Sequence, residues 1–326
     1  MSKSAFGALS GFLLAALAAV LWGTTGTVQT FIQSPTLSPL WVGALRVLCA
    51  CLFFYPALWM TEGRRAAPEK MVPQPAGSGG SYLLGVLAAG IAMALFNLLF
   101  FSGVKIAGVA LGSCTTIGAA PVWAGILDGI VRRKAPDRLW VTGVAIAIAG
   151  GVWMAVSQAE NVTVNPLGLA ICVAAGFCYA AYSMLAKSLV VMRSPLRASA
   201  HSFTVAAVIA LAAAFFFSET PEVILSDMAL VAYLGVVTTG VAYLLYGTAL
   251  KTTRVSTCVA LGLLEPVTAF VLAVAVVQES VNPWATAGLA AILAGLAVVL
   301  KSETRASNEP RGQKRLEKAN AIELRF

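Results

Sequence analysis

The sequence predicts an all-α membrane protein with ten transmembrane helices, arranged as two inverted five-helix repeats around a central cavity, with both termini cytoplasmic. Three observations predict this fold. The chain is strongly apolar, its basic residues fall in alternate loops, and prolines interrupt two apolar runs at matched places in the two halves. An ordinary soluble domain does not show these three features together.

Hydrophobic residues make up 59% of the 326 residues and charged residues only 11%, against about 25% charged in a soluble domain. Runs of about 20 apolar residues are long enough to cross the hydrocarbon core of a bilayer. The first run is interpreted as a retained helix rather than a secretory signal, because further spans follow it. The ten predicted spans cover residues 9 to 31, 40 to 60, 82 to 104, 107 to 130, 138 to 156, 166 to 187, 196 to 218, 228 to 250, 255 to 278 and 284 to 301.

The lysines and arginines indicate how the spans are oriented. With the N-terminus inside, twenty of the 22 basic residues lie in inside segments, while Lys105 lies in an outside loop and Arg46 within a span. Basic residues accumulate on the cytoplasmic side of membrane proteins. We therefore expect a multi-pass protein of the inner (plasma) membrane, and we read the net charge of +8 as topology rather than as a nucleic-acid site.

The two halves of the chain resemble one another. Gly11 and Trp22 match Gly168 and Tyr179 at an offset of 157, and Pro121 matches Pro266 at an offset of 145. A competing local register aligns Val109-Ala-Leu-Gly112 with Val259-Ala-Leu-Gly262. Because five spans is an odd number, the second copy enters the membrane in the opposite orientation. We expect a first repeat over residues 1–157, a second over 158–301, and a charged, disordered cytoplasmic tail over 302–326.

Pro121 and Pro266 predict kinks inside the fourth and ninth spans. A proline removes the helical hydrogen bond to the carbonyl four residues earlier, here that of Ile117 or Gly262. A membrane tolerates such a free carbonyl only where protein or a watery cavity receives it. The proline pair therefore indicates a cavity shared by the two repeats.

Three polar residues within predicted spans have two open interpretations each. Glu265 is a functional candidate because a carboxylate inside a membrane is costly; it binds a substrate amino group or a proton, or it is a structural partner of Arg46 or of kinked backbone. Arg46 suits a substrate carboxylate, or it pairs with a protein carboxylate or reaches toward the interface. Asn97 fits a zwitterionic ligand or an interhelical hydrogen bond.

Polar and aromatic residues concentrate in spans one, three, four, six, eight and nine, which we expect to surround the cavity. Spans five and ten show small residues at four-residue spacing, a pattern typical of close helix packing at the periphery. For each aromatic residue, simple packing is the alternative to a cavity role. The cavity candidates are Trp22, Thr25, Asn97, Thr115, Thr116, Tyr179, Tyr182, Tyr243, Tyr246 and Glu265.

Other chemistry finds little support in the sequence. His201 is the single histidine and is either a proton carrier or a structural residue, while Asp128 is expected to pair with Arg132 one turn away. The cysteines lie in or beside spans without metal-type spacing. There is no phosphate-binding loop. We therefore expect no metal, no cofactor and no enzymatic activity.

Four short motifs resemble one known family. They are Leu21-Trp22-Gly23-Thr24, the entry of the second helix from Ser38-Pro39-Leu40 to Arg46-Val47, Tyr246 with Ala249-Leu250-Lys251, and Leu264-Glu265-Pro266-Val267. In this order, and with the inverted repeat, they resemble the drug/metabolite transporter superfamily, specifically its ten-helix EamA-type members. The resemblance covers about residues 8 to 301 and is stronger for bacterial amino-acid exporters, including the aromatic type, than for anion carriers.

The resemblance implies a secondary transporter that exports amino acids, neutral or aromatic, or similar small metabolites by alternating access. A multidrug exporter of lipophilic cations and a non-transport membrane protein are the alternatives. The expected partners are a small-molecule substrate and the lipid bilayer, without nucleic acid, and a monomer is compatible with the sequence.

Overall fold

Helices joined by short connections form the described structure, a computed structural model that covers residues 3–34, 37–62, 78–157, 165–221, 225–278 and 282–308. Ten described segments are long and apolar enough to cross a membrane, which confirms the predicted number of spans. The helices are α1 (Lys3–Gln29), α2 (Pro39–Glu62), α3 (Ser78–Ala107), α4 (Val109–Arg132), α5 (Arg138–Ser157), α6 (Pro166–Met192), α7 (Pro195–Phe217), α8 (Leu225–Gly235), α9 (Ala242–Leu250), α10 (Val255–Ala260), α11 (Leu264–Ala275) and α12 (Pro283–Asn308).

The outer surface of the bundle is apolar. Trp59, Leu84 and Phe216 are among the large hydrophobic side chains that stay exposed. A soluble protein would bury such residues, whereas lipid tails solvate them. The exposed apolar surface therefore fits a bilayer.

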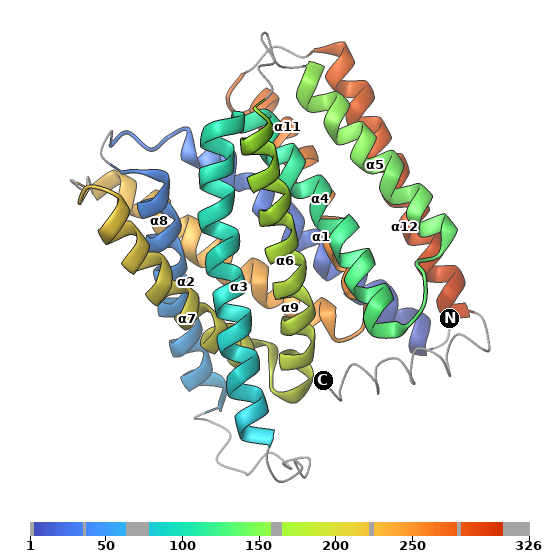
Figure 1. Cartoon of the computed structure of the whole chain (residues 1–326), viewed down its shortest axis with the longest axis horizontal. Helices are drawn as coiled ribbons and strands as arrows, with labels where there is room; N and C mark the ends of the chain where they lie inside the picture. The colour runs from blue at the N-terminus through green and yellow to red at the C-terminus, as the bar shows by residue number, and fades with distance from the viewer. Residues whose placement is uncertain are drawn as a thin grey trace.

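The helix contacts follow a two-fold pattern that exchanges the halves of the chain. α3 and α4 pack on α6, and in the same way α9 and α11 pack on α1. α2 pairs with α7, and α5 pairs with α12, so each of these pairs joins equivalent helices. α5 and α12 run side by side along one edge of the molecule, while α2, α7 and α8 lie along the opposite edge (Figure 1). Spans five and ten are thus peripheral, as expected.

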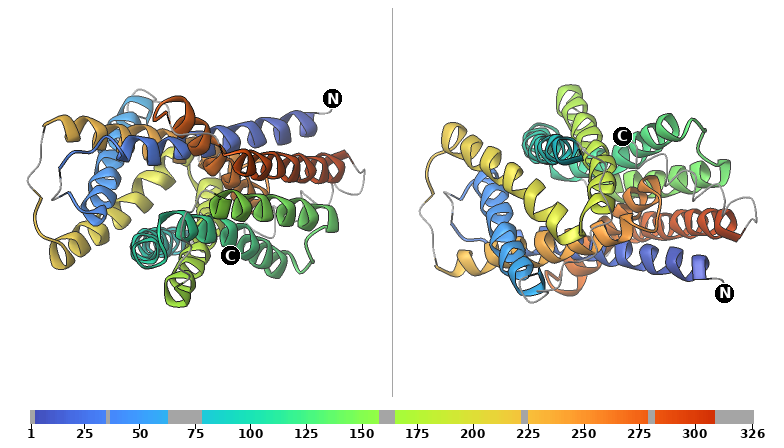
Figure 2. Two further views of the ribbon diagram at one scale, coloured as in Figure 1. Left: turned by 90° about the horizontal axis from the view of Figure 1, so that it is seen from above. Right: turned by 90° about the horizontal axis from the view of Figure 1, so that it is seen from below.

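Glycines allow α5 and α12 to approach closely. A Cβ atom on Gly143 would lie 2.7 Å from the carbonyl oxygen of Gly295, and one on Gly150 would lie 2.7 Å from that of Gly288. The offset of 145 makes Gly143 equivalent to Gly288 and Gly150 equivalent to Gly295, so the two contacts are one contact related by the two-fold axis. The inverted repeat is therefore visible in packing as well as in sequence. Both views of Figure 2 show α5 and α12 side by side.

Spans eight and nine are not continuous α-helices, which the sequence analysis did not predict for span eight. A π-helical segment, Val236–Val241, joins α8 to α9, and a 3₁₀ segment, Leu261–Leu263, joins α10 to α11. The hydroxyls of Thr238 and Thr239 both donate to the carbonyl of Leu234, at 2.7 and 2.8 Å. Helix irregularities of this kind commonly mark functional sites.

Two expected boundaries differ in the structure. α12 continues to Asn308, so residues 302–308 of the expected disordered tail are helical. Hydrogen bonds tie this helical extension to other segments: Ser302 donates to Asp137 at 2.8 Å, and Glu303 accepts from Thr257. The prolines and glycines between Met71 and Ser81 predict a flexible inside loop over 71–81, but α3 already begins at Ser78. The rest of that loop and residues 309–326 lie outside the described residues.

Candidate functional site

A cavity of about 800 Å³ lies between the two halves of the bundle. This volume is within the range of about 300 to 1,000 Å³ that is typical of small-molecule sites. Residues of spans one, two, three, four, six, eight and nine line it, together with Phe217 and Ser218 at the end of α7. The interior is therefore not filled by side chains, as a purely structural membrane bundle would require.

The cavity reaches only one end of the bundle, here called the open end. Its lining includes Pro39, Val109 and Phe217, which are exposed where α2 and α4 begin and α7 ends. The opposite end, called the basic end, holds Arg132 and Arg254 and contributes nothing to the lining. The structure is thus accessible from one side.

Aromatic rings form the inner end of the cavity. Trp22, Tyr179 and Tyr243 line it, and the Trp22 ring lies 6.1 Å from the Tyr179 ring and 5.1 Å from the Tyr243 ring. Tyr246 lies behind them, 5.3 Å from Trp22, and its hydroxyl donates to Ser183 at 2.9 Å. Trp22 and Tyr179 are equivalent positions of the two repeats, so the two-fold pattern places both copies in the same wall.

The carbonyls that the two prolines leave free belong to residues of the cavity lining. Ile117 and Gly262, whose carbonyls the prolines leave without a helical partner, line the cavity. α4 nevertheless remains α-helical around Pro121, whereas the ninth span changes to the 3₁₀ segment before Pro266. The first repeat thus accommodates its proline within a continuous helix.

One cation and one carboxylate lie in the deeper part of the lining. Arg46, on α2, and Glu265, at the start of α11, both line the cavity. No ion pair joins them among the described residues, and Glu265 has no hydrogen bond there either. The structural interpretation of Glu265 as a partner of Arg46 is therefore not the arrangement in this state.

Asn97 holds Arg46 instead. The Arg46 guanidinium donates from Nη2 to Asn97 Oδ1 at 2.7 Å, and Asn97 Nδ2 donates to the carbonyl of Met93 at 2.9 Å. Asn97 is buried and does not line the cavity. The Nε of Arg46 and the indole Nε1 of Trp22 are buried donors without a partner in the described residues. Both residues line the cavity, although these two nitrogens are themselves covered, and Arg46 brings a positive charge to the lining.

The other sequence candidates divide into two groups. Thr25 and Thr116 line the cavity, with the residues already described. Tyr182 is buried behind the aromatic wall, stacked 6.5 Å from Tyr179. Thr115 is absent from the lining, and so is His201, whose Nδ1 lies 3.1 Å from the hydroxyl of Tyr82.

Several lining residues escaped the sequence analysis. Phe96 and Phe100 stack at 5.8 Å on α3, and Phe101 and Lys105 follow toward the open end. Their spacing of four places Phe96 and Phe100 on one face of a helix, next to Asn97. That periodicity was a usable signal, but apolar aromatic residues are equally common on lipid-facing surfaces.

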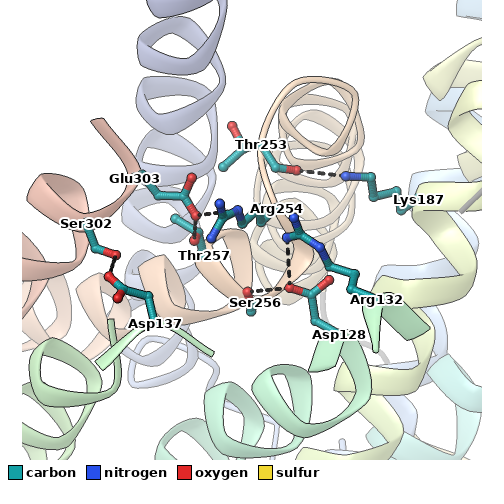
Figure 3. Close-up of polar contacts among 10 residues, drawn as sticks. All are labelled: Asp128, Arg132, Asp137, Lys187, Thr253, Arg254, Ser256, Thr257, Ser302 and Glu303. Atoms are coloured by element: carbon teal, nitrogen blue, oxygen red, sulfur yellow. Dashed lines mark hydrogen bonds and ion pairs between the residues drawn. The ribbon is translucent and has the colours of Figure 1, made fainter. Parts of the chain in front are cut away.

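Polar contacts join four segments at the basic end (Figure 3). Ser256, in the first turn of α10, donates to Asp128 of α4 at 3.0 Å, and Asp128 also pairs with Arg132 at 3.6 Å, as the sequence predicted. Arg254 pairs with Glu303 of α12 at 3.5 Å. These contacts, with those of Thr257 and Lys187 below, close the end of the bundle that the cavity does not reach.

The chain also matches a known protein family. A family model described as "EamA-like transporter family" matches residues 9–156 and 166–301, two stretches that each contain five of the spans. The chain belongs to the EamA-like transporter family. It is therefore a multi-pass membrane transporter, which excludes the non-transport alternative considered above.

Two further proteins resemble this EamA-like transporter over nearly their whole length. One is "Uncharacterized transporter YwfM" of Bacillus subtilis (strain 168), 30% identical over 308 residues, which are 94% of this chain and 97% of the relative. The other is a solved structure described only as "Crystal structure of protein", with a TM-score of 0.74 and 19% identity, covering 91% of this chain and 98% of that one. The second likeness shows the fold alone.

The family does not name a substrate, and no cofactor site emerges. Among the described residues, no group of three or more histidine, cysteine, aspartate or glutamate side chains could hold a metal ion. The chemistry that the cavity offers is non-covalent: Arg46 and Glu265 in its deeper part, Lys105 toward the open end, and a wall of aromatic rings.

Proposed function

We propose that this transporter exports neutral amino acids, chiefly aromatic ones, across the inner membrane, with both termini in the cytoplasm. One observation carries the proposal: Arg46 and Glu265 line the same cavity without pairing with each other. An amino acid at neutral pH carries one carboxylate and one ammonium group. It offers each of these residues an opposite charge and keeps the deeper part of the occupied cavity neutral.

The wall of the cavity supports the aromatic preference. Trp22, Tyr179 and Tyr243 present rings at the inner end, and Phe96 and Phe100 add apolar surface on α3. Ring pairs contribute about 0.5–1.5 kcal/mol beyond the burial of their area. A substrate with a large apolar side chain gains this energy, whereas glycine or serine does not.

The test is counterflow in proteoliposomes. Purified protein is reconstituted into vesicles loaded with unlabelled amino acid, and uptake of labelled phenylalanine, tryptophan, leucine and glycine is measured with and without a pH gradient. We expect saturable uptake that is strongest for phenylalanine and tryptophan. No counterflow of any amino acid across a broad panel would refute the proposal, and the pH arm shows whether protons are coupled.

A matched pair of variants makes the test specific. Glu265→Gln removes the negative group from the cavity, and we expect it to weaken phenylalanine uptake. Glu219→Gln makes the same chemical change at an exposed residue outside the lining, and uptake should remain at the wild-type level. Equal loss in both variants would contradict the assigned role of Glu265.

One observation favours a second candidate, export of lipophilic cations. Glu265 shares the cavity with the rings of Trp22 and Tyr243, and a carboxylate beside aromatic faces also suits an organic cation. Arg46 argues against it, because a second positive charge would be repelled. Counterflow of tetraphenylphosphonium that Glu265→Gln abolishes, with no flux of any amino acid, would favour this candidate.

A further inference from the structure

α10 is a short, isolated piece of the ninth span. All six of its residues, Val255–Ala260, are buried, and the 3₁₀ segment separates it from α11. Gly262, within that segment, has free space around its Cα, since an added Cβ would meet nothing within 4 Å. The backbone at this point is thus neither α-helical nor tightly packed. The 3₁₀ segment is a break between α10 and the rest of its span.

Side chains and backbone at the start of α10 bind three other helices (Figure 3). Ser256 donates to Asp128 of α4, and Thr257 donates to Glu303 of α12. Glu303 also forms an ion pair with Arg254. Lys187 of α6 donates to the backbone carbonyl of Thr253 at 3.2 Å. We call these contacts the α10 clamp. They are interhelical and polar, whereas the α5–α12 pair relies on glycine packing.

The start of α4, in the first repeat, is equivalent to the start of α10 but is not closed by such contacts in the part of the chain that the structure describes. The offset of 145 that aligns Pro121 with Pro266 also brings the first residue of α4, Val109, within one position of the first residue of α10, Val255. Val109 is 74% exposed and lines the cavity, whereas Val255 is 0% exposed. The same helix start is therefore open in one repeat and sealed in the other.

The difference extends along both helices. In α4 the cavity follows the chain from Val109 through Ser113 to Ala120, but in the ninth span it begins only at Val259. Cys258, which aligns with Ser113, is buried behind the clamp. Deeper in, Ile117 and Gly262 line the cavity equally. The two repeats thus agree at the centre and differ at their ends.

We propose that α10 is the gate of the basic end, that it moves about the 3₁₀ segment Leu261–Leu263, and that the α10 clamp holds it shut. Alternating access in inverted-repeat transporters comes from rocking or gating of one repeat against the other, and we take the position of α4 as the second position of α10. α10 then occupies the open position that α4 has here, and the cavity extends along it to Cys258. The inference rests on family membership and not on the proposed substrate.

The experiment measures the reactivity of Cys258. Each of the natural cysteines is kept singly in an otherwise cysteine-free protein, and a membrane-impermeant maleimide is applied from the side to which the sequence assigns the termini. Cys258 should react slowly with an intact clamp. Thr257→Val, which removes the donor to Glu303, should raise its labelling rate about 10-fold, the equivalent of one hydrogen bond to a charged group.

Two controls keep the test decisive. Thr257→Ser retains the hydroxyl and should leave the rate near that of the wild type. A protein that keeps only Cys172, which is buried on α6 away from the clamp, should stay unreactive in every background. If Thr257→Val does not fold, Ser256→Ala breaks the contact with Asp128 instead. Cys258 that never reacts, or that reacts only when Cys172 reacts as well, would overturn the proposal.

Discussion

Replacing Asn97 by aspartate tests whether Arg46 binds the substrate carboxylate. Asn97 Oδ1 accepts a hydrogen bond from Arg46 Nη2 at 2.7 Å, and the amide is fixed from behind by the carbonyl of Met93. A neutral amide orients the guanidinium without cancelling its charge. Aspartate has nearly the same shape and places a negative oxygen at the same point, so Asn97→Asp converts a free cation into an internal ion pair. It also loses the hydrogen bond to the Met93 carbonyl, a loss that affects every substrate alike.

The magnitude follows from the interaction that is lost. A hydrogen bond to a charged group contributes about 1.5–3 kcal/mol, and about 1.4 kcal/mol corresponds to a factor of ten in affinity. The half-saturating concentration of phenylalanine should therefore rise about 10- to 150-fold in Asn97→Asp. Phenylalaninamide, which has the ammonium group but no carboxylate, should keep its half-saturating concentration, because its contact with Glu265 is unchanged.

The assay is counterflow of both compounds in the same proteoliposomes. Asn165→Asp is the matched control: Asn165 caps α6 by accepting from the backbone N–H groups of Leu167 and Gly168 at 3.1 and 3.2 Å, a role that aspartate performs equally well. Equal weakening of phenylalanine and phenylalaninamide in Asn97→Asp, or no change in either, would refute the role of Arg46. Absence of all counterflow in the wild-type protein would instead refute the proposed function.

Two further predictions concern stability, measured as thermal unfolding in detergent. Gly150→Ala would place a Cβ 2.7 Å from the carbonyl oxygen of Gly288, and overpacking of this kind lowers stability by about 1–3 kcal/mol. The control is Gly80→Ala on α3, where an added Cβ meets nothing within 4 Å and should be neutral or stabilising. Equal melting temperatures of the two variants would contradict the close approach of α5 and α12. Asp227→Ala removes a fully buried carboxylate that accepts from the N–H of Ser34 at 2.8 Å, so it should lower stability by about 1–3 kcal/mol. An unchanged melting temperature would show that this contact does not hold the α1–α2 connection to α8.

The number of spans was predictable because it depends on local properties of the sequence. A span needs only sufficient apolar length, and the distribution of basic residues follows chain order. The internal offsets carried more information: they paired Trp22 with Tyr179, and the structure brings these two rings within 6.1 Å of each other in the cavity wall. The proline pair likewise located Ile117 and Gly262, both of which line the cavity.

Contacts between distant helices were not predictable, because they depend on the rotation and tilt of each helix. Thr257 and Glu303 are 46 residues apart, and nothing in either segment distinguishes a clamp from a solvated tail. The same reason explains why Asn97 was expected in the cavity, whereas it lies behind Arg46. The π-helical segment of span eight, in which two threonine hydroxyls share the carbonyl of Leu234, is likewise a property of the folded backbone.

The two repeats share their fold but not their charge, and this difference suits a transporter with a single site. Ala120 and Glu265 occupy equivalent positions, and both line the cavity. A glutamate in each repeat would place two negative groups opposite one Arg46, and a zwitterion would then leave one of them unpaired. With alanine in the first repeat, the deep cavity carries one charge of each sign. Under the proposed function, symmetry of the backbone allows access to alternate, while asymmetry of the side chains keeps one orientation of the substrate bound throughout.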